Sequence, residues 1–97
     1  MYILIQQDGT LSLEECTEMK SFSIIDKSDN KNRTGLDAIA TAAEDNHYWI
    51  DAEAVITLSP QGGDQQWKDN FWNMLKAVEP YGYSNLAEKQ VKAHVED

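Results

Sequence analysis

The stretch DQQWKDNFWNMLKAVEP, residues 64–80, constrains the fold more than any other part of the chain. It follows two consecutive glycines and opens on Asp64, a residue type that caps helix N-termini. It ends at Pro80, which disfavours helical geometry in the residue before it. The stretch therefore predicts one long amphipathic helix over residues 64–79.

Two of the three tryptophans lie on this helix, at different positions around its axis. With successive residues about 100° apart, one apolar stripe holds Trp67, Phe71, Met74, Leu75 and Val78. Trp72 lies about 110° from the centre of that stripe. The pattern predicts that Trp67 is a core residue, and that Trp72 either packs beneath the following segment or contacts a partner.

Two tyrosines follow this helix, in the segment EPYGYSN. Tryptophan and tyrosine are over-represented among residues that dominate binding energy at protein interfaces. The candidate interface is therefore Trp72 with Tyr81 and Tyr83.

Four segments have the composition of β-strands. The first begins near Tyr2, the second spans residues 21–26, the third spans Tyr48–Ile50, and the fourth lies near Val91. Two segments stay open between strand and helix. Residues 51–58 alternate like a strand, yet Asp51 could cap a helical turn, and residues 86–95 fit either pattern.

Two further helices are expected. Ser12 and Glu15 have the spacing of a capping box, which predicts a short helix over Leu13–Met19. Alternatively, Asp8-Gly9 closes a hairpin whose second strand begins at Thr10. The second helix starts at Thr34 and places four residues on one face, namely Leu36, Ile39, Ala40 and Ala43.

The resulting fold class is α+β, with residues 1–97 forming a single domain. We expect a small, partly antiparallel sheet of about four strands, covered by two or three helices. With 41% hydrophobic residues, the chain has enough apolar surface for one core. That core should bury Trp67, Phe71, Leu36 and Ile39 together.

The charge is strongly acidic, with 8 Lys and Arg against 17 Asp and Glu, a formal net charge of −9. This balance argues against binding nucleic acid through its phosphates. No basic residue occurs between Arg33 and Lys68, where six acidic residues lie. The acidic segment is either a solvated surface or a contact for a basic partner.

No motif for chemistry is complete. Residues 26–37 resemble a calcium loop in part, but Lys31 stands where the turn requires glycine. Cys16 is the only cysteine, and His47 and His94 lie in no metal-ligand spacing. We therefore expect no catalytic residue, no cofactor and no metal.

The predicted function follows from these observations. The chain lacks an apolar run of about 18 residues and a signal peptide, which predicts a cytoplasmic protein without membrane contact. The first hypothesis is a non-enzymatic protein-interaction module, or a homodimer. The second is an acidic mimic of nucleic acid that blocks a DNA-binding protein. The third is a small enzyme, or an accessory subunit, using Asp45, His47 or His94 in a cleft.

Overall fold

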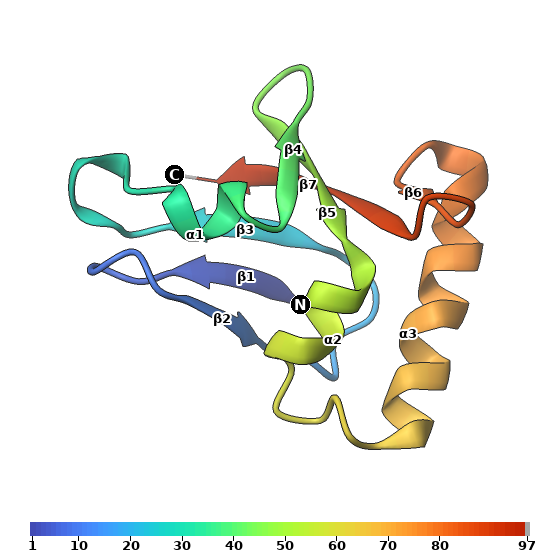
Figure 1. The fold of residues 1–97 in the computed structure, drawn as a ribbon. Coiled ribbons are helices and arrows are strands. Elements are labelled where there is room, and N and C mark those ends of the chain that lie inside the picture. The colour runs from blue at the N-terminus through green and yellow to red at the C-terminus, as the bar shows by residue number, and fades with distance from the viewer. Residues whose placement is uncertain (97) are drawn as a thin grey trace.

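The computed structural model describes residues 1–96 and has an α+β architecture, with a mixed seven-stranded sheet and three α-helices (Figure 1). The strands are β1 Tyr2–Ile5, β2 Leu11–Glu14, β3 Ser23–Asp26, β4 Ala40–Ala42, β5 His47–Asp51, β6 Ser84–Asn85 and β7 Gln90–Glu96. The α-helices are α1 Thr34–Asp37, α2 Ala52–Leu58 and α3 Gln65–Val78. Two 3-10 helices are η1 Asp29–Lys31 and η2 Glu79–Tyr81.

The sheet has the order β2-β1-β3-β7-β5-β4. The pairs β1–β3 and β3–β7 are parallel, and the pairs β1–β2, β4–β5 and β5–β7 are antiparallel. One edge of β7 pairs with β5. The other edge is shared, because Val91 faces Ser84 of β6 and Val95 faces Ile24 of β3. A notch therefore remains between β6 and β3.

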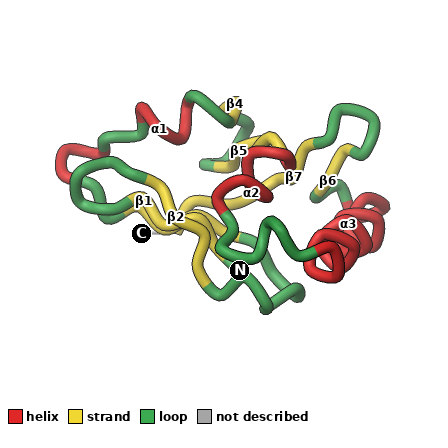
Figure 2. The backbone as a smooth tube through the Cα atoms, turned by 60° about the horizontal axis from the view of Figure 1, so that its bottom comes forward, coloured by secondary structure: helices red, strands yellow, loops and turns green. Residues whose placement is uncertain are grey.

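The two faces of the sheet differ in their cover. Alternation buries Ile3, Ile24 and Val95 on one face, while Leu4 and Ile25 on the other stay partly exposed. The two ribbon views place α1 and α2 over one face, with α3 beside the sheet next to β6 (Figures 1 and 2). The contacts of α2 with β2 and β5, and of α3 with β6, agree with this arrangement.

The long helix joins the core as its apolar stripe predicts. Trp67, Phe71 and Leu75 are buried, and the rings of Trp67 and Phe71 stack with centroids 5.3 Å apart. The indole N–H of Trp67 donates a hydrogen bond to the carbonyl of Cys16 at 2.6 Å. Trp67 is therefore a core residue and ties α3 to the segment between β2 and β3.

The structure confirms the long helix and all four expected strands. The Asp64 side chain accepts a hydrogen bond from the Gln66 amide at 2.9 Å, so Asp64 caps α3. The structure also shows which conformation the two ambiguous segments, residues 51–58 and 86–95, adopt. Residues 52–58 form α2, capped by Asp51, and β7 occupies the end of the last segment.

The helix expected over Leu13–Met19 is wrong, and the hairpin alternative is right. Gly9, at a φ of 90°, lies in the turn, and Leu11–Glu14 pairs with β1. In β2, Leu11 and Leu13 face Ile5 and Ile3 across the ladder. The period-2 spacing of these leucines matches the sheet, so burial outweighs the local capping signal.

The helix expected from Thr34 forms, but its expected extent to Ala43 is wrong, because α1 ends at Asp37. Ala40–Ala42 instead forms β4 and pairs with β5. Small residues fit both a close helix face and an edge strand, and here the edge of β5 gains backbone partners. Leu36 is buried as expected, whereas Ile39 is only partly buried.

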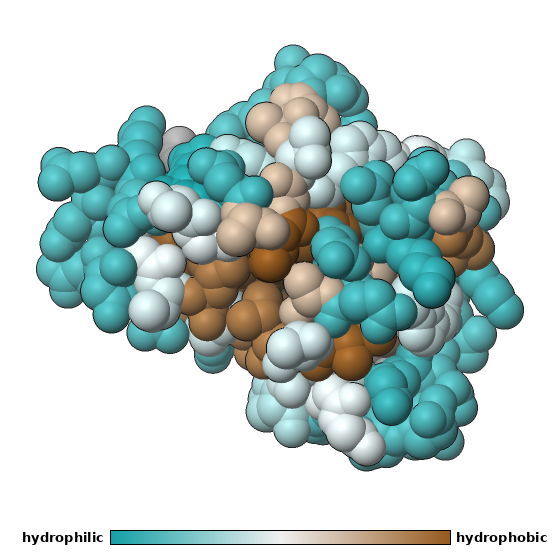
Figure 3. All heavy atoms as spheres, viewed as in Figure 1, coloured by the Kyte–Doolittle hydropathy of each residue, from teal (hydrophilic) through white to brown (hydrophobic). Residues whose placement is uncertain are grey.

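The shortness of α1 leaves part of the core thinly covered. On the face viewed in Figure 3, hydrophobic residues reach the surface near α1 and α2 and are surrounded by hydrophilic ones. Partly buried apolar side chains packed against the core include Leu11, Ile39 and Ile56.

The turn between α2 and α3 requires glycine at one position. A Cβ atom at Gly62 would overlap the carbonyl oxygen of Ile56 and lie 3.2 Å from that of Ser59. We expect Gly62→Ala to lower the free energy of unfolding by about 1–3 kcal/mol, because the obstacle is backbone. Gly63→Ala is the matched control, since a Cβ there meets nothing within 4 Å. Urea unfolding of both variants checks this, and equal stabilities would contradict it.

Candidate functional site

The segment after α3 presents two aromatic side chains to solvent. Pro80 lies in the first turn of η2, and Gly82, at a φ of 85°, ends it in the left-handed region. Tyr81 is 77% exposed and Tyr83 is 52% exposed. Among residues 1–96 they are the two exposed large hydrophobic residues. Solvent exposure of such side chains is the feature that most suggests a contact surface.

Hydrogen bonds hold this segment in place. The buried Ser84 hydroxyl donates to the carbonyl of Leu75 at 2.5 Å, which ties β6 to α3. The Lys92 amide donates to the carbonyl of Tyr83 at 2.8 Å. Both tyrosines therefore project from a backbone fixed by a helix and by the longest strand, so their positions are preorganised for binding.

A pocket of about 260 Å³ adjoins Tyr83. It lies between the end of α3, the segment leading into β3, and β7, as the notch between β6 and β3 allows. We call it the Tyr83 pocket, and its lining residues are Met19, Lys20, Ser21, Phe22, Met74, Val78, Tyr83, Val91 and Lys92. Six of these nine side chains are apolar or aromatic, so the pocket suits an apolar group.

The charged groups of the Tyr83 pocket are both basic, although the whole chain carries a formal charge of −9. Lys20 is exposed. Lys92 bonds to Glu44 at 2.6 Å, and its ammonium group lies 5.7 Å from the ring centroid of Trp49. The hydrogen bond with Lys92 holds the pKa of Glu44 below its ordinary value. Glu44 therefore offsets the charge of Lys92, and Lys20 is the basic residue of the pocket that forms no ion pair within residues 1–96.

The structure separates Trp72 from the Tyr83 pocket. Trp72 is partly buried against the core and meets Phe71 edge-on, with ring centroids 5.9 Å apart. On the helix it lies about 160° from Met74, a pocket residue, at about 100° per residue. Of the three candidate interface residues, Tyr83 alone lines the pocket. Tyr81 and Tyr83 share a segment, while Trp72 occupies the other flank of α3.

The sequence did not indicate the pocket residues as a site. Met74 and Val78 belong to the core stripe of α3, and Phe22 to a predicted strand, so each looks like an ordinary core residue. Only the tertiary placement of α3 beside residues 19–22 and β7 brings them around one cavity. Tyr83 alone carried a signal, through its residue type.

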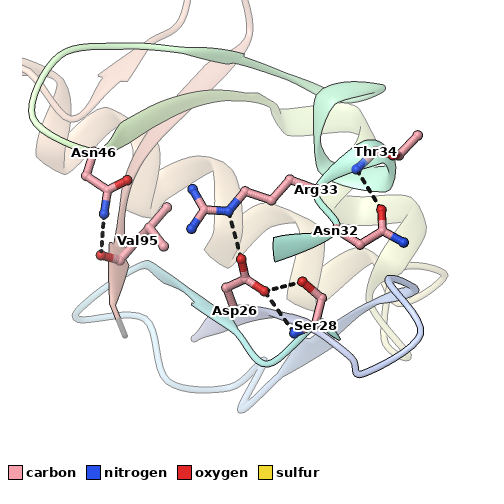
Figure 4. A network of polar contacts seen from close by, with 7 residues as sticks. All are labelled: Asp26, Ser28, Asn32, Arg33, Thr34, Asn46 and Val95. Atoms are coloured by element: carbon pink, nitrogen blue, oxygen red, sulfur yellow. Dashed lines mark hydrogen bonds and ion pairs between the residues drawn. The ribbon is translucent and has the colours of Figure 1, made fainter. Parts of the chain in front are cut away.

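The partial calcium motif forms a different structure (Figure 4). One carboxylate oxygen of Asp26 accepts hydrogen bonds from the amide and hydroxyl of Ser28, and the other accepts one from Arg33 Nε at 2.7 Å. The same view shows the Asn46 amide donating to the Val95 carbonyl. Asp26 is thus committed to protein donors and holds the 27–33 loop onto β3.

The structure brings together His47 and His94, two residues of the enzyme hypothesis. Their ring centroids lie 4.8 Å apart. Asp45 contributes its main-chain carbonyl, which contacts His47 Nδ1 at 2.9 Å. Neither histidine lines the Tyr83 pocket.

Comparisons with protein-family models, curated proteins and solved structures found no match. Within residues 1–96, every helix is too short or too polar to span a bilayer.

Proposed function

We propose that this chain is a protein-interaction module that binds its partner through Tyr81, Tyr83 and the Tyr83 pocket. The observation that carries this proposal is the coincidence of the two exposed tyrosines with an apolar pocket lined by Tyr83 itself. Interface energy is concentrated in a few aromatic anchors beside well-packed pockets. An exposed tyrosine next to an apolar cavity supplies both parts of such a hot spot.

The size of the pocket supports a protein partner over a free cofactor. Its volume of about 260 Å³ is below the range of about 300–1,000 Å³ that is usual for pockets of drug-sized ligands. It suits one large side chain of a partner. Tyr81 and Tyr83 would then cover the neighbouring surface of that partner and exclude water from the anchor.

The rim charges define the chemistry of the partner segment. Lys20 lies at the pocket and is exposed, while Lys92 is already paired with Glu44, so an apolar anchor with one Asp or Glu beside it is the favoured sequence. A second copy of this acidic chain also fits that description, which retains the homodimer as a form of the same proposal. The nucleic-acid mimic predicts a different contact. Carboxylates of this chain would carry the binding, and the affinity would be lost as the salt concentration rises.

The test is a capture experiment with the tagged chain in lysate of its source organism, at low and high salt, followed by affinity measurement with the purified partner. Tyr83→Ser should weaken binding about thirtyfold, corresponding to about 2 kcal/mol for a hot-spot residue. Val78→Phe should weaken it too, because the added ring fills the pocket. Self-association is measured on the same variants by sedimentation.

Glu88→Ser is the matched control, because Glu88 is exposed on the turn before β7 and does not line the pocket. It should bind like the unmodified chain. Unchanged affinity in both Tyr83→Ser and Val78→Phe would reject the Tyr83 pocket as the contact site. Loss of binding at high salt in every variant would favour the mimic.

A further inference from the structure

The two histidines of the chain face each other across neighbouring strands. His47 of β5 and His94 of β7 are direct partners in the antiparallel register, so their side chains lie on the same face of the sheet. This is the face opposite to that of Val91 and Val95. The ring centroids are 4.8 Å apart with an interplanar angle of 57°.

The hydrogen bonds of His47 fix its tautomer. Nδ1 lies 2.9 Å from the carbonyl oxygen of Asp45 and 3.2 Å from that of Glu44. Carbonyl oxygens only accept hydrogen bonds, so Nδ1 must carry the proton. The lone pair of the neutral ring is then on Nε2. A metal-binding histidine is commonly held in the same way, with its second nitrogen donating to a backbone carbonyl.

We propose that His47 and His94 together chelate one divalent transition-metal ion of the zinc class. Two nitrogens bound to zinc at about 2.0–2.1 Å in tetrahedral geometry lie roughly 3.4 Å apart. Rings with centroids at 4.8 Å reach that separation by small side-chain rotations. His94 is exposed, so its ring is free to adjust.

The proposed site is open. Within residues 1–96, no group of three or more His, Cys, Asp and Glu side chains is placed to hold a metal ion. Water therefore completes the coordination, and the site binds metal less tightly than a closed four-ligand site. The acidic surface raises the local concentration of any cation, so specificity must come from the imidazoles.

The test is calorimetric titration of the chain with Zn²⁺ at 0.15 M salt, beside His94→Gln, His47→Gln and the double variant. The chain has only two histidines, so the double variant removes every imidazole. The expected result is one zinc ion per chain, at least tenfold weaker binding in each single variant, and no imidazole-dependent binding in the double variant. Both rings hold one ion, so losing either removes the chelate.

Several outcomes would overturn the proposal. Two independent imidazoles would give two ions per chain, and each single variant would lose one ion at unchanged affinity. One ion per two chains would place the site between copies. Equal Zn²⁺ binding by the double variant would assign the ion to carboxylates. A parallel titration with Mg²⁺ measures binding to carboxylates alone, because Mg²⁺ prefers oxygen ligands.

A second measurement does not depend on how the variants fold. In ¹⁵N spectra of the unmodified chain, Zn²⁺ should shift Nε2 of His47 and leave Nδ1 protonated. A shift confined to Nδ1, or none at saturating Zn²⁺, would reject the site. Thermal unfolding without metal checks that each variant is folded before its titration is compared.

Discussion

Phe71→Ala is expected to lower the free energy of unfolding by about 3–5 kcal/mol, the usual cost of removing a fully buried phenylalanine ring. The ring is 0% exposed, stacks on Trp67 and meets Trp72 edge-on. Its removal leaves a cavity in the core beside α3 and also takes away the ring that contacts both indoles of the helix. Chemical unfolding followed by tryptophan fluorescence measures the change.

Trp72→Ala is the control for this prediction, because Trp72 adjoins Phe71 in sequence but is only partly buried. We expect a smaller loss than for Phe71→Ala, since less apolar surface leaves a buried environment. Should Phe71→Ala not fold, Phe71→Leu tests the same buried contacts at a smaller cost. An equal or greater loss in Trp72→Ala would show that the flank of α3 contributes as much to the core as its centre.

Asp26→Ala is expected to cost about 2–3 kcal/mol, near the lower end for breaking a buried ion pair. The side chains of Asp26 and Arg33 are 4% and 18% exposed, so the remaining guanidinium would be largely, not fully, desolvated. The Ser28 amide and hydroxyl would also lose their acceptor. Glu44→Ala is the contrast, because the Glu44 carboxylate is 68% exposed in its pair with Lys92, whereas that of Asp26 is buried, so its loss should change stability less.

The same variant has a distinct pH dependence. Burial raises the pKa of Asp26, but the hydrogen bonds from Ser28 and Arg33 outweigh burial, so the pKa lies below its ordinary value. A folded-state pKa below the unfolded value contributes stability above about pH 3.9, and that contribution is lost as pH falls through the folded pKa. The stability difference between Asp26→Ala and the unmodified chain should therefore be greatest near neutral pH and shrink below about pH 4. A constant difference across that window would contradict this assignment.

The candidate contact surface was only partly visible in the sequence. Residue type singled out Trp72, Tyr81 and Tyr83, but residue type does not say which rings share a surface. The α3 geometry places Trp72 on the flank away from Met74, while η2 and β6 bring Tyr83 to the pocket. Phe22 and Met74 were invisible as site residues because a pocket-lining side chain and a core side chain have the same hydrophobicity.

Short elements show where local signals fail. The capping pair Ser12 and Glu15 predicts a helix, yet Leu11 and Leu13 enter the sheet because burying both against β1 stabilises more than one cap. The alanines after α1 satisfy a helical period and a strand equally well. Their conformation was decided by the open edge of β5, the next strand along the chain, which the periodicity of the alanines does not reveal.

Sequence patterns alone were enough for the α+β class, the long helix and the strands β1, β3 and β5, because strong periodicity, a capping aspartate and a terminating proline act within a few residues. Other features were decided only by the tertiary structure. They are the choice of a hairpin instead of a helix at β2, the pairing of β4 with β5 and of β6 with β7, the Tyr83 pocket, and the contact of His47 with His94. The pocket and the histidine pair depend on segments far apart in the chain. The pairings of β2, β4 and β6 join neighbouring segments, but they stabilise the chain only as parts of the whole sheet.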